Sequence, residues 1–167
     1  MFAALLLTVS GALAFRALTR DDVDRASTDP RPVTVTTGTT PEFSDPLADP
    51  RPAVAPFEGL TEARVTVDDE ALRVVIADEP DERQQGLRER DSLGPYDAML
   101  FVFPEDTDGP FTMSRVPVDL DVRWLSVDGR VVSETRMAAC PDGDDQSCPR
   151  YEPGATYRFA LETIAAG

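Results

Sequence analysis

Apolar and polar residues alternate along much of the chain after residue 60, and this alternation predicts β-strands. Residues 63–67 alternate, Asp68-Asp69 favours a turn, and residues 72–77 continue as a second strand. A continuous apolar run at 99–103 predicts a strand that is covered on both faces. The first half of this region therefore indicates short strands joined by tight turns.

The clearest alternation comes later in the chain. Residues 118–125 alternate and are followed by Asp128-Gly129 and by a further expected strand at 131–137. An Asp-Gly pair between two such segments is a strong signal for a β-hairpin. Two more short strands are expected, at 111–113 and at 156–161.

One short helix interrupts the strands. Proline is tolerated in a first helical turn, as at Pro80, and the acidic Asp81 and Glu82 complement the helix dipole there. A helix is therefore expected over 82–90, interrupted by Gly86. Many short strands with one helix predict a mainly β fold, a small β-sandwich or barrel-like domain with one short helix.

The N-terminal segment, residues 1–15, is almost entirely apolar and fits a signal peptide or a short membrane anchor. The apolar run 2–15 is shorter than the roughly 20 residues that span a bilayer. Ala12-Leu13-Ala14 supplies the small-x-small pattern of a cleavage site. We expect the protein to lie outside the cytoplasm, either secreted or tethered to the cell membrane by this segment.

Residues 16–59 have a different composition and contain seven of the 15 prolines, mixed with Thr, Asp and Ala. Such a segment buries too little apolar surface to offset its ordering entropy, which predicts a disordered stalk. Residues 60–167 then form one β domain. A chain cut before about residue 58 should keep this domain folded.

The charge is strongly negative, with 31 acidic against 16 basic side chains and a net charge of −15. This balance argues against a nucleic-acid partner, which needs a basic face. There is no His and no Lys, so imidazole-based nucleophiles, imidazole metal sites and the phosphate-binding P-loop are excluded. We expect no metal and no cofactor.

Cys140 and Cys148 are the only cysteines, and two thiols without His make a poor zinc site. In an exported protein they predict a disulfide that closes a polar loop. The acidic segments 106–109 and 142–145 lack the spacing of a calcium loop, so we interpret them as solvated turns.

Six short motifs follow one another along residues 63 to 167. They are Glu82-Arg83-Gln84-Gln85-Gly86-Leu87, Met99-Leu100-Phe101-Val102-Phe103, Phe111-Thr112-Met113, Leu120-Asp121-Val122, Asp128-Gly129-Arg130-Val131-Val132 and Ala160-Leu161-Glu162. In this order they resemble the bacterial and archaeal family called domain of unknown function 192. The resemblance implies a small β-sandwich, often exported, whose biochemical activity is not established and from which no catalytic residue can be transferred.

The chain departs from the family pattern in two places. Where the family usually has Phe-Trp-Met-Lys-Asn-Thr, this sequence reads Phe-Thr-Met-Ser-Arg-Val over residues 111–116. The usual Met after Gly-Leu is replaced by Arg88. If the first segment lines a ligand groove in relatives, the ligand or its affinity differs here.

Four polar residues inside or beside these motifs are the candidate ligand-binding residues, namely Arg83, Arg115, Asp121 and Glu162. Arginines facing a groove could clamp a carboxylate or a sugar, whereas structural ion pairs are the plainer interpretation. The function favoured is a non-catalytic extracytoplasmic binding module, a monomer with a shallow groove for a small ligand, a glycan or an envelope partner. The alternative is a hydrolase of a glycan or cell-envelope polymer that uses Asp121 and Glu162 as its carboxylate pair.

Overall fold

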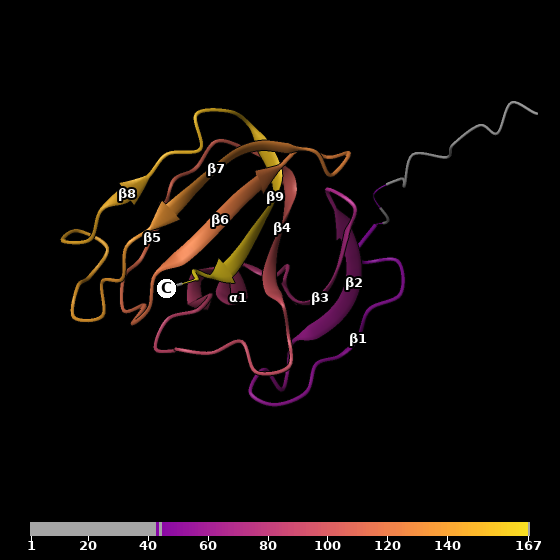
Figure 1. Ribbon diagram of the computed structural model, residues 1–167, viewed down its shortest axis with the longest axis horizontal. Coiled ribbons are helices and arrows are strands. Elements are labelled where there is room, and N and C mark those ends of the chain that lie inside the picture. Colours follow the sequence, from indigo (N-terminus) through magenta and orange to yellow (C-terminus); the bar gives the residue numbers. More distant parts are fainter. Residues whose placement is uncertain (1–42, 44, 167) are drawn as a thin grey trace, which may run out of the picture. The chain divides into compact units, whose positions relative to one another are not determined.

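The computed structural model describes residue 43 and residues 45–166. A seven-stranded sheet has the order β1-β2-β3-β4-β9-β6-β7, and β5 and β8 form a separate two-stranded sheet (Figure 1). The elements are β1 (Arg51–Pro52), β2 (Thr61–Val67), β3 (Glu70–Ala77), α1 (Pro80–Gln85), β4 (Ala98–Thr107), β5 (Phe111–Thr112), β6 (Leu120–Leu125), β7 (Val131–Met137), β8 (Arg150–Tyr151) and β9 (Tyr157–Ile164).

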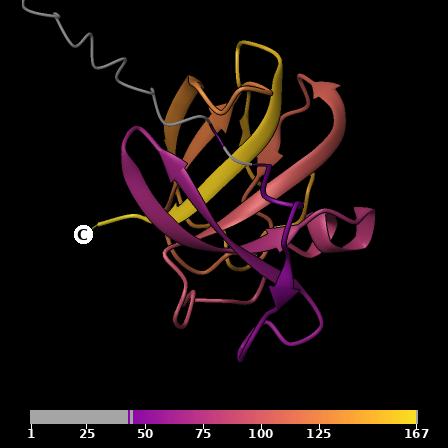
Figure 2. The same cartoon turned by 90° about the vertical axis from the view of Figure 1, so that its right-hand side faces the viewer.

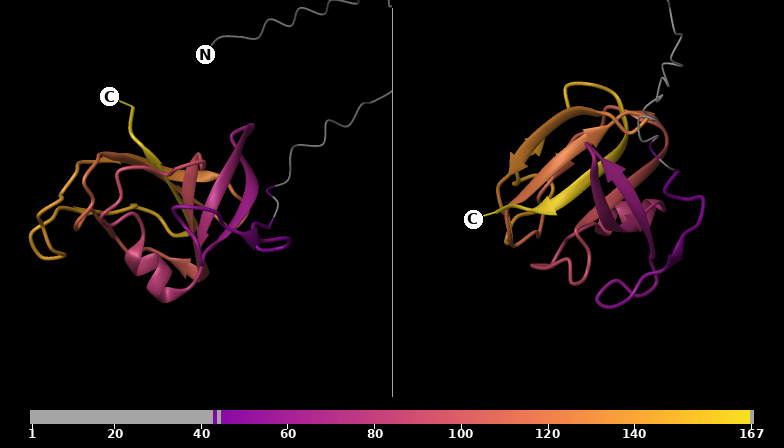
Figure 3. Two further views of the ribbon diagram at one scale, coloured as in Figure 1. Left: turned by 90° about the horizontal axis from the view of Figure 1, so that it is seen from below. Right: turned by 45° about the vertical axis from the view of Figure 1, so that its right-hand side comes forward.

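The last strand, β9, lies inside the sheet rather than at its edge (Figure 1). It pairs antiparallel with β4 on one side and with β6 on the other. β3 and β4 are parallel, and the connection between them contains α1, which lies beside these strands (Figure 3). Every other strand pair in the described residues is antiparallel.

Two tight hairpins form where the sequence predicts them. Asp68 and Asp69 join β2 to β3 with φ values of 49° and 66°, the left-handed conformation that a two-residue hairpin turn requires. Gly129 turns the chain between β6 and β7 with φ 75°, and its N–H donates to the carbonyl of Ser126. Both turns connect neighbouring antiparallel strands.

The sheet curls so that the β2–β3 hairpin crosses over one of its faces (Figure 2). Arg123 on β6 lies 3.8 Å from the carboxylate of Asp68 and 3.7 Å from that of Glu70, at the turn of this hairpin. The apolar residues enclosed on this face are Val65, Val67, Leu72, Val74, Ile76, Ala98, Leu100, Val102, Leu125, Phe159 and Leu161.

The opposite face of the sheet carries the other half of the core, beneath α1 and the loops. Because strand residues alternate between faces, Trp124 and Ala160 point to this side while Leu125 and Leu161 point to the first. Leu87, two residues after the helix, and Met113, directly after β5, belong to the same cluster. The candidate site lies on this face.

The mainly β class with one short helix is confirmed, and the sheet is not closed into a barrel. The helix is shorter than the one predicted over residues 82–90. It begins at Pro80 and ends at Gln85, because Gly86 leaves the helical conformation with φ 47°. A Cβ at Gly86 would also lie 3.2 Å from Cζ of Phe101, so this ring would have to move by a few tenths of an ångström to admit a side chain.

The structured domain begins before Leu60, inside the segment interpreted as a stalk. Pro52 pairs with Thr61, and the N–H of Ala53 donates to the carbonyl of Leu60. Phe57 is 1% exposed and packs edge to face on Tyr96. The expected signal or anchor segment, and residues 16–42 of the expected stalk, lie outside the described residues.

The position of Phe57 gives a test of the domain boundary. A chain starting at Glu58 should unfold at a temperature more than about 10 °C below that of a chain starting at Asp45. The loss of a buried Phe costs about 3 kcal/mol or more, and one kcal/mol shifts the midpoint of a small domain by roughly 4–8 °C. Thermal unfolding of the two chains checks this, and equal midpoints would show that residues 45–57 add nothing to the fold.

Candidate functional site

A cavity of about 280 Å³ lies where α1, the turn after it and strands β4, β5 and β9 meet. Four aromatic side chains, Phe101, Phe103, Phe111 and Tyr157, form much of its wall. The ring centroids of Phe101 and Phe111 are 5.3 Å apart, as are those of Phe103 and Tyr157, and both pairs meet edge to face. These contacts give the cavity an apolar wall whose rings hold one another in place.

Arg83 projects from α1 into the cavity lining. The helix start that positions it is stabilised by the Glu82 carboxylate, which accepts hydrogen bonds from the N–H groups of Asp78 and Glu79 at 3.1 Å each. Nη1 of Arg83 donates to the carbonyls of Asp78 and Val102. The guanidinium group is thereby tied to the backbone on both sides of the connection.

Glu162 is the buried acidic residue of the cavity. It lies on β9 between Met99 of β4 and Val122 of β6, and it is 4% exposed. Within the described residues, no hydrogen bond or ion pair reaches its carboxyl group. Burial raises the pKa of Glu162 to about 8, because the charged form is poorly solvated among apolar neighbours.

Two hydroxyl groups also belong to the lining. The hydroxyl of Thr112 on β5 is buried and has no hydrogen-bond partner in the part of the chain that the structure describes. Tyr157 donates its hydroxyl proton to the carbonyl of Gly109 at 2.7 Å, and burial raises its pKa. The Thr112 hydroxyl and the carboxyl of the buried Glu162 therefore lack partners within these residues, whereas Gln84, whose side chain also has no hydrogen-bond partner there, is exposed to solvent.

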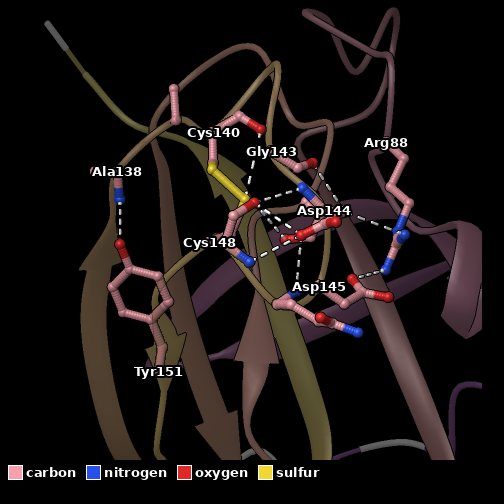
Figure 4. The surroundings of a disulfide bond; sticks show 12 residues. Arg88, Ala138, Cys140, Gly143, Asp144, Asp145, Cys148 and Tyr151 are labelled. Atoms are coloured by element: carbon pink, nitrogen blue, oxygen red, sulfur yellow. Dashed lines mark hydrogen bonds and ion pairs between the residues drawn. A yellow bond between two sulfur atoms is a disulfide. The ribbon is translucent and has the colours of Figure 1, made fainter.

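Arg88 connects the cavity to the disulfide loop (Figure 4). Its Nη2 lies 2.7 Å from the Asp145 carboxylate, inside the loop closed by the Cys140–Cys148 disulfide. The hydroxyl of Ser114 donates to the carbonyl of Gly143 at 3.2 Å in the same loop. The predicted disulfide is confirmed. The loop that it closes supplies the Asp145 carboxylate that pairs with Arg88, one of the two arginines that line the cavity.

Of the four candidate residues taken from the sequence, Arg83 and Glu162 line the same cavity and the other two do not. Arg115 is about half exposed, and its Nη1 lies 3.1 Å from the carboxylate of Glu89. Asp121 precedes Val122 on β6 and so points to the other face, where its carboxylate pairs with Arg136 at 3.1 Å. Both residues form surface ion pairs in the structure.

The aromatic wall and Thr112 were not among the candidates. Phe101 and Phe103 are two positions apart on β4, a spacing that places both on one face of a strand. Phe111 and Tyr157 reach the same wall from segments that are far apart in the sequence. No local pattern marks such a meeting, because it depends on the β4–β9 pairing.

A second hollow, of about 520 Å³, lies around β2 and β3 and is lined mostly by polar residues. Two of its charged side chains, Arg73 and Glu62, form an ion pair. Nη2 of Arg73 lies 2.5 Å from Oε2 of Glu62, and the Tyr96 hydroxyl donates to the same oxygen at 2.7 Å. The hydrogen bond from Arg73 lowers the pKa of Glu62. This hollow has satisfied ion pairs where the smaller cavity has an unpartnered carboxyl, so we take the smaller cavity as the candidate site.

Among residues 43 and 45–166, no group of three or more acidic or cysteine side chains is arranged to hold a metal ion. Nor does this part of the chain contain a helix with the length and apolar character of a membrane span.

The family model for domain of unknown function 192, described as an uncharacterized ACR, matches residues 63–166. The chain therefore belongs to this family. The match begins within β2, ends two residues after β9, and contains every residue of the cavity lining.

Solved structures share the fold. A protein of unknown function from Novosphingobium aromaticivorans has a TM-score of 0.56 and 23% identity, with 72% of this chain and 84% of that chain covered. A protein from Sinorhizobium meliloti, assigned provisionally as a transcription regulator, has a TM-score of 0.51 and 25% identity, with 61% of this chain and 78% of that chain covered. Among curated proteins, none matches the chain.

The raised pKa of Glu162 predicts how stability depends on pH. The unfolded chain releases this proton near the ordinary value of 4.5 and the folded chain near 8, so the folded state holds one more proton between these values. The wild-type free energy of unfolding should therefore fall by about 1.4 kcal/mol per pH unit in this window, through this group. Glu162→Gln has no such proton, so its stability relative to wild type should rise with pH.

Denaturant melts of wild type and Glu162→Gln at pH 5, 6, 7 and 8 measure the difference directly, because the other titrating groups are common to both chains. A difference in unfolding free energy that stays constant over this range would show that Glu162 titrates normally in the folded protein.

Proposed function

We propose that the domain is a non-catalytic module that binds a small organic molecule in the cavity beside α1 and acts outside the cytoplasm. The observation that carries this proposal is the buried carboxyl of Glu162, which has no partner within the described residues and lies in the lining of an aromatic cavity. A ligand that contacts the rings and hydrogen-bonds this group would supply what the fold leaves unsatisfied.

An acidic residue at this position costs stability, since burying a carboxyl group without a partner is unfavourable whether it is charged or neutral. The neighbours Met99 and Val122 are apolar and buried, and an apolar residue would continue their pattern. Groups that break a local packing rule in this way are concentrated at functional sites. This reasoning favours a role for Glu162 in binding over a role in folding.

Hydrolysis is less well supported. Glycoside hydrolases use two carboxyl groups on either side of the scissile bond. Glu162 is the acidic residue among those that line the cavity, and Asp121 points to the opposite face of the sheet. We therefore do not propose that these two residues form a catalytic pair.

We do not extend to this chain the assignment of the Sinorhizobium protein as a transcription regulator. The net charge of −15 would repel the phosphate backbone of DNA.

The location outside the cytoplasm is supported by the apolar segment 2–15 and by the disulfide between Cys140 and Cys148. Disulfides persist in oxidising compartments and are rare in the cytosol. The bond also fits a structural role, because it closes a loop rich in Asp that has little apolar surface of its own.

The disulfide gives a test of this location and of the loop. Protein recovered from outside the cytoplasm should contain no alkylatable thiol before reduction. Replacing both cysteines by serine should lower the free energy of unfolding by about 2–3 kcal/mol, the chain-entropy estimate for so short a loop. The sheet should remain, because the backbone of Cys140 still bonds to Val116 and Arg115.

Mass spectrometry after alkylation, followed by denaturant melts, makes both measurements. Two alkylated thiols in the native protein would remove this support for the location. Loss of the whole fold on reduction would mean that the bond supports the core.

Binding is tested by a ligand-observed NMR screen of the full chain against a library of small aromatic and aliphatic fragments. The matched variant is Thr112→Phe, which fills part of the cavity and removes a hydroxyl that makes no hydrogen bond to the described residues. The control is Thr135→Phe, at an exposed position on β7 outside the cavity lining. Hits should bind wild type and the control and should be weakened at least about tenfold by Thr112→Phe, as expected when a ring occupies the ligand's space.

A screen without hits would contradict the binding function. Hits that bind Thr112→Phe as tightly as wild type would show that ligands bind elsewhere on the protein.

A further inference from the structure

We propose, building on the binding function above, that the ligand is an organic ammonium compound, a primary or secondary amine whose positive charge is held between Glu162 and the aromatic wall. The proposal identifies the chemical class of the ligand from the groups that the cavity leaves without partners.

The first argument is the balance of charges around the cavity. The acidic and basic side chains of the lining come from α1, the turn after it and β9, namely Arg83, Arg88 and Glu162. Arg83 donates to two backbone carbonyls and Arg88 pairs with Asp145 at 2.7 Å. Glu162 has no such partner within the described residues, so a ligand cation would complete the set.

The second argument is the chemistry of the wall. Phe101 lies on the same face of the sheet as Glu162, diagonally across the β4–β9 pairing, because Phe101 pairs with Ala160 and Met99 pairs with Glu162. Phe111 packs edge to face against Phe101 at 5.3 Å. Aromatic faces attract cations, and enclosing an ammonium group with rings and one carboxylate is a recurrent way of binding it.

The third argument is that Arg83 does not occupy the part of the cavity next to Glu162. The guanidinium group of Arg83 lies 5.3 Å from the ring centroid of Phe103, whereas Glu162 lies opposite Met99. Met99 and Phe103 are separated by a rise of about 13 Å along β4. The positive group of Arg83 therefore contacts the aromatic wall at one end, and Glu162 lies towards the other.

The unpartnered hydroxyl of Thr112 gives the cavity a second oxygen that can accept a hydrogen bond. A primary or secondary ammonium group has N–H donors for both oxygens. A quaternary ammonium group has none, and so satisfies the site less well.

The proton balance of binding follows from this assignment. In the unliganded protein at pH 7 the Glu162 carboxyl is mostly protonated, because burial raises its pKa to about 8. An ammonium ligand favours the carboxylate, so its binding expels the carboxyl proton to solvent while the ammonium keeps its own. The other charged side chains facing the cavity are Arg83 and Arg88, burial raises the pKa of Tyr157 and keeps it protonated, and β4 and β5 contribute no titratable side chain to the lining.

The experiment uses the full chain and three probes of the same shape: benzylamine, benzyl alcohol and benzoate. Calorimetry at pH 7 in two buffers of different ionisation enthalpy should show that benzylamine releases about one proton on binding. Its affinity should rise about tenfold per pH unit from pH 5.5 to 7.5, as the ionised fraction of Glu162 does. Benzyl alcohol should bind at least about tenfold more weakly at pH 8, without proton release, since it lacks the charge.

The matched variant is Glu162→Gln, which keeps the shape of the side chain and cannot ionise. It should weaken benzylamine at least about tenfold at pH 8 and abolish both the proton release and the pH dependence, while benzyl alcohol binding changes little.

Tighter binding of benzoate than of benzylamine would overturn the ammonium assignment, as would benzylamine binding without proton release or failure of all three probes to bind. The proposed binding function has its own test in the fragment screen. Fragments that bind in the cavity but are neutral or anionic would leave that function intact and refute only the ligand class.

Discussion

The pairing of β9 with both β4 and β6 is the constraint on which the rest of the structure depends. It inserts the last strand of the chain into the interior of the sheet and sets which face each of its residues occupies. Leu161 faces the core beneath the β2–β3 hairpin, so its neighbour Glu162 must face the opposite core. A slip of one residue in this register would exchange the two and bury the carboxyl beneath the hairpin.

The same pairing assembles the cavity. Tyr157 and Glu162 come from β9, Phe101 and Phe103 from β4, and the helical connection between β3 and β4 adds Arg83. The sheet thus supplies a rigid floor that carries Glu162, while short segments on one face add Arg83 and Thr112. This arrangement is typical of binding sites, in which loops and strand ends on a fixed scaffold carry the specific contacts.

Local patterns were sufficient to predict much of the fold. Alternation and apolar runs together located most of the longer strands, Asp68-Asp69 and Asp128-Gly129 located two hairpins, and Pro80 located the helix start to within two residues. They did not locate the beginning of the domain, because a Pro-rich segment resembles a linker until Phe57 is seen to be buried against Tyr96.

The site was predicted less completely, for a physical reason. Glu162 was identified as a polar residue in a motif, but neither its unpartnered burial nor the rings around it can be derived from local sequence. Asp121 belongs to an equally recognisable motif and forms a surface ion pair. Glu162 is buried and Asp121 is at the surface because of the way distant strands pair, and single-sequence patterns do not encode this pairing.

The central claim is that Glu162 is a buried carboxyl whose partner is supplied by a ligand. The most direct measurement is an NMR titration of its side-chain carboxyl carbon, assigned by comparison with Glu162→Gln, in the full chain with and without saturating benzylamine. The account predicts a midpoint near 8 for the protein alone, the pKa that burial gives this group, and a midpoint displaced well below that when the amine is bound. A midpoint near the ordinary value of 4.5 in both samples would contradict it.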